Sequence, residues 1–217
     1  MTGLTSSPRL IKGALIGVDL FNPLASIVVF QYNPDTMTRR LEPRGGGGTG
    51  GGDKGEAFRL AGPPKETITV SVEIDASDQL EQNNPLAIAT GITPTLAALE
   101  MLVYPKTALV IANSVLGAAG IIEILPTDAP MTLFVWGPTR VLPVKVGGIT
   151  ITEEAYDTLL NPIRAKVELT LNVLSYNDLS LGTAGNALFM VHQVTKEVLA
   201  MTNIFASIQN VGAGLKL

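Results

Sequence analysis

The chain has 217 residues, of which 46% are hydrophobic and only 16% are charged, and its net charge is −4. This apolar composition, rich in β-branched residues, excludes a disordered chain, and the weak negative charge gives no broad footprint for nucleic acid. The sequence has no cysteine, which excludes disulfides and thiolate chemistry and fits a cytoplasmic location.

Strands are expected to dominate the first third of the chain. Residues 9–18 and 26–32 are rich in β-formers, and residues 66–74 alternate apolar and polar side chains with a period of two. One face of this last strand should therefore be buried and the other polar. After residue 32, Pro34 removes a ladder donor and biases Asn33 away from helix, so the Tyr-Asn-Pro turn is expected to redirect the chain.

The glycine-rich run RGGGGTGGGDKG, residues 44–55, has almost no side chains to pack and is expected to form a mobile loop. It fails as a phosphate-binding loop because Lys54 is followed by Gly55 rather than by Ser or Thr. The alternative role is a loop that becomes ordered against a neighbouring subunit.

Two helices are expected in the middle of the chain. Residues 92–104 should form the first, with Thr93 as its cap and Pro105 as its stop. The uncharged segment 107–122 is shorter than the ~20 residues that span a bilayer. It favours a buried helix over residues 107–116, or a helical hairpin, while membrane association is the weaker alternative.

Strands return in the second half of the sequence. Residues 131–136 form an apolar run, and segments 141–146 and 149–152 flank Gly147-Gly148, which indicates a bulge or tight bend. Residues 164–174 show the clearest alternation in the chain.

The tail is expected to form one long helix over residues 186–208, capped by Asn186. Apolar residues recur on it every three or four positions and form one stripe: Leu188, Val191, Val194, Val198, Met201, Phe205 and Ile208. Such a helix must dock on its own domain or on a partner, and the pattern alone leaves both open.

No constellation of residues indicates a catalytic, metal or cofactor site. The single histidine, His192, lies in the apolar terminal helix, and no G-x-S-x-G motif accompanies it. The carboxylates of residues 75–81, where Asp78 is expected to cap a short helix, and of residues 153–157, expected in a hairpin loop, lack metal-ligand spacing. We therefore expect a protein that is not an enzyme and that holds no metal or cofactor.

Three stretches resemble a known family when taken together. They are VVFQYNPDTM at 28–37, ETITVSVEIDA at 66–76, and MTLFVWGPTRVLPVKVGGITITEEAYDTLLNPIRAKVELTLNVLSY at 131–176. Their order is similar to the tube-protein domain of contractile injection systems, the phage-tail-like machines that drive a spiked tube out of a contracting sheath. The resemblance covers roughly residues 10–176. In its best-known setting that domain carries a LysM module, whereas this chain has only the apolar helix after Tyr176.

The resemblance implies an α+β, mainly β fold: a split antiparallel β-barrel with a helical insertion at about 92–122, over residues 1–180, followed by a docking helix and tail over 181–217. It also implies a structural baseplate or tube-adaptor protein that works in a ring, expected to be hexameric. The expected partners are tube, spike-hub and baseplate-wedge proteins. Neither a nucleic-acid partner nor a membrane span is expected. Physical reasoning agrees, because strands covered on both sides need a second face of low charge. The expected contact residues are Arg44, Lys54, Thr67, Thr69, Ser71, Thr170, Asn172, Leu188, Val191, Val198 and Phe205.

The alternative is a small ligand-binding or hydrolase-accessory module with a pocket between the barrel and the helices of residues 92–118.

Overall fold

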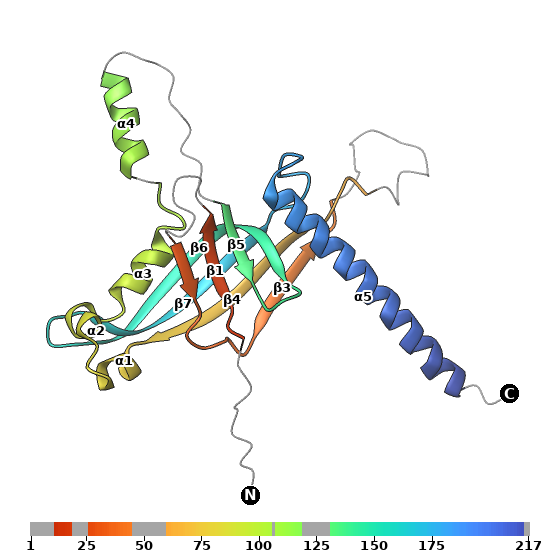
Figure 1. Cartoon of the computed structure of the whole chain (residues 1–217), viewed down its shortest axis with the longest axis horizontal. Helices are drawn as coiled ribbons and strands as arrows, with labels where there is room; N and C mark the ends of the chain where they lie inside the picture. Colours follow the sequence, from red (N-terminus) through yellow and green to blue (C-terminus); the bar gives the residue numbers. More distant parts are fainter. Residues whose placement is uncertain (1–10, 19–25, 45–59, 106, 119–130, 215–217) are drawn as a thin grey trace, which may run out of the picture.

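The computed structural model describes residues 11–18, 26–44, 60–105, 107–118 and 131–214. Its elements, in chain order, are β1 (Ala14–Val18), β2 (Ser26–Val29), β3 (Met37–Glu42), β4 (Lys65–Asp75), α1 (Ser77–Glu81), α2 (Pro85–Thr90), α3 (Thr93–Glu100), α4 (Thr107–Ala118), β5 (Met131–Val135), β6 (Val141–Tyr156), β7 (Pro162–Val173) and α5 (Ala184–Gly214). The fold is mixed α and β, with helices inserted between β4 and β5 and one long helix at the C-terminal end (Figure 1).

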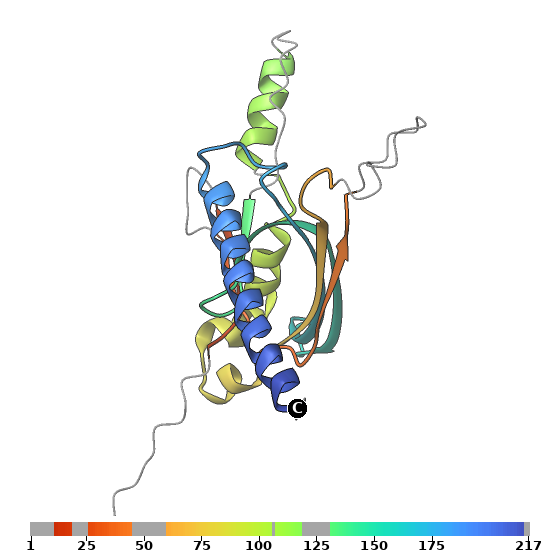
Figure 2. The same ribbon diagram turned by 90° about the vertical axis from the view of Figure 1, so that its right-hand side faces the viewer.

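The strands form one antiparallel sheet with the order β2-β1-β5-β6-β7-β4-β3. Its long strands curve strongly, so that the sheet wraps around one side of the core (Figure 2). In the described part of the chain β2 and β3 each pair with one neighbour only, so the sheet is not closed into a barrel. The expected split barrel is therefore an open, curled sheet.

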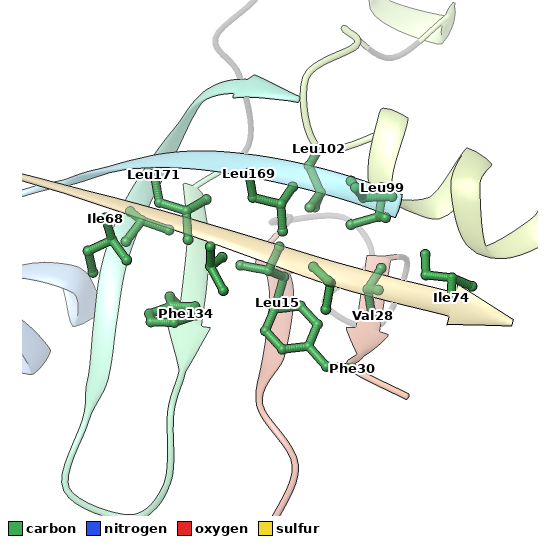
Figure 3. Close-up of a cluster of buried hydrophobic side chains, with 14 of the residues drawn as sticks. Leu15, Val28, Phe30, Ile68, Ile74, Leu99, Leu102, Phe134, Leu169 and Leu171 are labelled. Carbon is green, nitrogen blue, oxygen red and sulfur yellow. The ribbon is translucent and has the colours of Figure 1, made fainter. Parts of the chain in front are cut away.

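The helix α3 packs against the short edge strand β2. Leu96 and Leu99 of α3, with Leu102 in the following turn, join the core cluster. Figure 3 shows Leu99 and Leu102 beside Leu169 of β7. These side chains make α3 part of the core that the curled sheet surrounds.

The alternation in β4 and β7 is confirmed. Residues of β4 from 66 to 74 and of β7 from 165 to 173 are buried at every second position, because the two strands face the core with the same side. The register pairs Val70 with Leu169 and Val72 with Val167, so the buried sets of both strands lie side by side. The Gly147-Gly148 bulge is also confirmed, since the register of β6 against β7 shifts between Val146 and Gly148.

The Phe-Gln-Tyr-Asn-Pro segment after β2 holds three parts of the chain together. Asn33 Oδ1 accepts a hydrogen bond from the Gly13 amide at 2.9 Å, and its Nδ2 donates to the Ile11 carbonyl at 2.9 Å. Gln31 Oε1 accepts from the Asp75 amide, also at 2.9 Å, at the far end of β4. The side chains of this turn thus connect the start of β1 with the end of β4.

Several local expectations are corrected. Asp78 lies in the first turn of α1 rather than at its cap, and the Asp75 carboxylate accepts the Ser77 amide there at 2.6 Å. Thr93 does not cap α3, because it is already helical and Ile92 holds the cap position. Glu153 and Glu154 belong to the long strand β6, not to a loop.

The start of α5 also differs from the expectation. Asn186 does not cap the helix but lies inside it, and its backbone amide donates to Thr183 Oγ1 at 3.3 Å. Thr183 therefore occupies the place of the capping hydroxyl. The side chain of Asn186 is buried and donates from Nδ2 to the Leu179 carbonyl at 3.2 Å.

Candidate assembly surfaces

The helix α5 has two sides with different surroundings. Its N-terminal half packs against β6, and Phe189 there joins the core and meets the Tyr176 ring edge-on, with centroids 6.0 Å apart. Figure 1 shows that the C-terminal half extends beyond the sheet. The docked side carries residues 185, 189, 192 and 196, which share one face at 3.6 residues per turn.

The apolar stripe predicted from the sequence lies on the opposite side of α5. Its side chains are open to solvent, with exposed fractions of 64% at Val191, 53% at Val194, 57% at Val198 and 60% at Met201. The stripe is therefore not docked on this chain's own sheet. Leu188 is half-buried, and Phe205, whose side chain lies outside the described residues, continues the spacing on the helix backbone.

A second group of expected contact residues lies on the outer face of β4 and β7. The register places Thr67 opposite Asn172 and Thr69 opposite Thr170, and Thr67 Oγ1 lies 3.3 Å from Asn172 Oδ1. Ser71 follows on the same face. The structure thus brings together the five strand residues that the sequence singles out, on the side of the sheet that faces away from the core cluster.

Arg44 is held within the chain. Its Nη2 lies 3.0 Å from Asp178 Oδ2, in the segment between β7 and α5. Burial raises the pKa of Asp178, but hydrogen bonds from Ser175 and the pairing with Arg44 outweigh it and keep that pKa below its usual value. Lys54 and the rest of the glycine-rich loop after Arg44 lie outside the described residues.

A charged cluster beneath α5 was missed at the level of sequence. Glu66 is only 5% exposed, and its carboxylate accepts a hydrogen bond from Arg39 Nε at 2.7 Å and another from Lys196 Nζ at 3.3 Å. Burial alone would raise the pKa of Glu66, but the bonds and charges of Arg39 and Lys196 lower it below its usual value. The sequence did contain a signal for this cluster, because the alternation of β4 places Glu66 on the same face as the buried Ile68 and Val70.

His192 lies beside this cluster on the docked face of α5. It is 7% exposed, and neither ring nitrogen has a hydrogen-bond partner. Burial and the charge of Lys196 lower its pKa, against weaker opposing effects of the Thr139 carbonyl and Glu66. The ring is therefore expected to be neutral near pH 7, and it packs on the docked face of α5.

The helix α4 stands apart from the sheet in both views (Figures 1 and 2). Val110, Ile111 and Val115 are exposed, so the expectation of a buried helix is wrong for the isolated chain. The chain reaches α4 only after Pro105. The helix that packs on β2, α3, has already ended there, so α4 lies beyond this contact.

A cavity of about 510 Å³ opens between the sheet and the helices α1 to α3. Its floor is apolar, with Phe30, Val72 and Leu99, and its rim is polar, with Lys12 and Asp78. The expected pocket between the sheet and the helices of residues 92–118 is thus present in part, but α4 contributes no lining residue among those described.

Other kinds of site were sought in the described ranges. They contain no group of three or more His, Asp or Glu side chains that could hold a metal ion. No helix within them has the length and hydropathy needed to cross a bilayer. No family model matches the sequence, and no curated protein matches it either.

Proposed function

We propose that this chain is a structural subunit of a phage-tail-like contractile injection system. In this proposal it is a baseplate or tube-adaptor protein that works in a ring of copies and links the inner tube to the spike hub and the baseplate. The chain acts through contacts between proteins and not as an enzyme. The split, tail-tube-like barrel of that family would then be completed in the assembly, because the outer edges of β2 and β3 pair with no further strand among the described residues.

The observation that carries the proposal is the solvent-facing apolar stripe of α5. A monomer rarely keeps a row of large apolar side chains in water, because each would be more stable when buried by roughly 1.5–3 kcal/mol. Val191, Val194, Val198 and Met201 form such a row on a helix that extends past its own sheet. This geometry fits a subunit whose folding is completed by its neighbours.

Two further features support the proposal. The three stretches that resemble the tube-protein domain fall mainly on β2, β4, β5, β6 and β7 of a single sheet, so they belong to one structural unit. The outer face of β4 and β7 presents Thr67, Thr69 and Thr170, and its oppositely charged residues Glu73 and Lys166 stand opposite each other. A face of this kind can be covered by another protein when its hydroxyl groups find hydrogen-bond partners there and its charges stay paired.

The decisive experiment is incorporation into particles. The chain is co-produced with the sheath, tube and spike proteins of a contractile injection system, and particles are purified and probed for the chain. A version that ends at Glu197 keeps Phe189 and Lys196, and with them the docked half of α5, but loses the outer half of the stripe. It should fold and melt like the full chain yet be absent from particles.

The matched control is a version that ends at Ile208, which keeps the complete stripe and should enter particles normally. If the chain ending at Glu197 also enters particles at the full level, α5 is not the docking element. If the full chain never accompanies sheath and tube proteins, the proposed function is wrong.

The cavity favours a second candidate function, a small ligand-binding module. A compound with an apolar body and a polar end would fit its apolar floor and polar rim. Such a compound should raise the melting temperature of the chain. The Ala87→Phe variant, which fills the cavity from its buried wall, should abolish that shift. A shift that persists in this variant would place the ligand elsewhere.

A further inference from the structure

We infer that the stripe of α5 packs against the same stripe of other copies of this chain, as a parallel helical bundle along the rotation axis of the ring. This inference rests on the proposed function in one respect, the assembly of identical copies. It names the partner of α5, which the proposed function leaves open among the copies, the tube, the hub and the wedges.

The spacing of the stripe is the first argument. From Val191 the steps to Val194, Val198 and Met201 are three, four and three residues, and the sequence continues with steps of four and three to Phe205 and Ile208. This regular alternation is the pattern of positions a and d in a coiled coil, where helices supercoil so that one narrow seam stays in contact.

The position of the stripe is the second argument. The docked side of α5 is held to the sheet by Phe189 in the core and by the Lys196–Glu66 ion pair. The a and d positions therefore point away from the sheet, and a partner helix can approach them without displacing α5 from its own chain. The backbone of α5 stays helical to Gly214, long enough to carry the whole seam.

Charge is the third argument. Between Ala184 and Ile204 the ionisable residues of α5 are His192, Lys196 and Glu197. The first two lie on the docked side, so Glu197 alone borders the seam. Identical helices placed side by side thus bring few like charges together, which removes the usual obstacle to self-association.

Symmetry gives the direction. Copies in a cyclic ring are related by rotation about one axis, so helices that gather at this axis run parallel and present the same face to it. The seam is short for an independent coiled coil. The ring compensates, because it holds the helices at a high effective concentration.

The absence of cysteine from the chain permits a direct test by single-cysteine cross-linking. Val198→Cys places a thiol in the seam, and Ala200→Cys, exposed on the same helix but outside the seam, is the matched control. Disulfides form only when Cα atoms lie within about 7 Å, so V198C should form dimers at least about tenfold faster than A200C under mild oxidation. The full chain is used, both purified and within particles.

A second measurement does not depend on disulfide geometry. The Val194→Asp, Val198→Asp double variant should lower the molar mass of the purified chain in light scattering, while Ala200→Asp should not. Val194, Val198 and Ala200 are all exposed, so circular dichroism and melting of both variants should match the wild type. Equal cross-linking rates at positions 198 and 200, with an unchanged mass of the double variant, would overturn the inference.

The two proposals fail separately. The double aspartate variant is also tested for entry into particles. If V198C forms no dimers but this variant fails to enter particles, α5 docks on a different protein and only the bundle is wrong. If V198C cross-links well but the chain never joins sheath and tube proteins, the bundle stands and the proposed function is wrong.

Discussion

Lys196 of α5 donates from Nζ to Glu66 Oε2 at 3.3 Å and so ties the C-terminal helix to the first residues of β4, although the two residues lie 130 positions apart in the sequence. The other oxygen of the same carboxylate accepts from Arg39 on β3. One buried acid therefore joins an edge strand, its neighbour and the helix. This contact fixes which side of α5 faces the sheet and, in consequence, which side remains free.

The substitution Glu66→Gln should destabilise the chain by about 1–3 kcal/mol, because it leaves two cations near a buried position without their counter-charge. The value is below that of a fully buried pair, since Arg39 and Lys196 are 26% and 42% exposed. Urea unfolding measures the change. Glu42→Gln is the control, because Glu42 and its partner Arg40 are both exposed, and it should cost less than about 0.5 kcal/mol. Equal effects of the two substitutions would contradict the role given to Glu66.

Stability should fall when the pH drops from about 7.5 to about 5.5, and His192 should account for much of this loss. Burial and Lys196 lower the pKa of His192, while Glu66 on β4 and the Thr139 carbonyl oppose the shift and Arg140 reinforces it. As the pH falls, His192 therefore binds its proton at a higher pH in the unfolded chain than in the folded chain. Stability is lost as the pH falls through the unfolded pKa of 6.5. The variant His192→Gln carries no titrating ring.

The measurement compares urea unfolding of the wild type and His192→Gln across this pH range. Since the chain has a single histidine, few other groups titrate in the window. The slope of stability against pH should be smaller in the variant. An unchanged slope would show that His192 titrates alike in the folded and unfolded chain.

Phe189→Ala should cost about 3–4 kcal/mol, because Phe189 is buried in the core against Tyr176 and leaves a cavity when it is removed. Leu199→Ala, ten positions further along α5, removes an exposed side chain that lies outside the seam and should change stability by less than about 0.5 kcal/mol. Thermal unfolding of both variants tests whether α5 really has a docked half and a free half. A comparable loss at both positions would mean that the helix is held along its whole length.

Gly91→Ala should destabilise the chain by about 2–4 kcal/mol. Gly91 has φ of 56°, which strains a residue with a side chain, and an added Cβ would collide with the Pro162 carbonyl oxygen. The same carbonyl accepts the Ile92 amide at 2.9 Å, so it cannot move without losing the bond that joins α3 to β7. Gly148→Ala is the control, since nothing lies within 4 Å of its added Cβ, and it should be close to neutral. Melting curves that coincide for the two variants would contradict this account.

Periodicity in the sequence determined the elements that alternate or repeat regularly. The alternation of residues 66–74 and 164–174 predicted β4 and β7, and the Gly147-Gly148 pair predicted the bulge in β6. The spacing of the tail predicted α5 and its apolar stripe. These features depend on the local geometry of strand and helix, which a single segment expresses without its neighbours.

Only the tertiary structure decided which surfaces are covered. It placed the stripe of α5 in solvent and the Lys196 side against Glu66, left α4 exposed, and packed α3 against β2 and the core. The sequence pattern could not decide this, because an apolar stripe has the same spacing whether it meets its own sheet or another chain. The choice depends on contacts such as Glu66 with Lys196, whose partners lie far apart in the sequence and meet only in the folded chain.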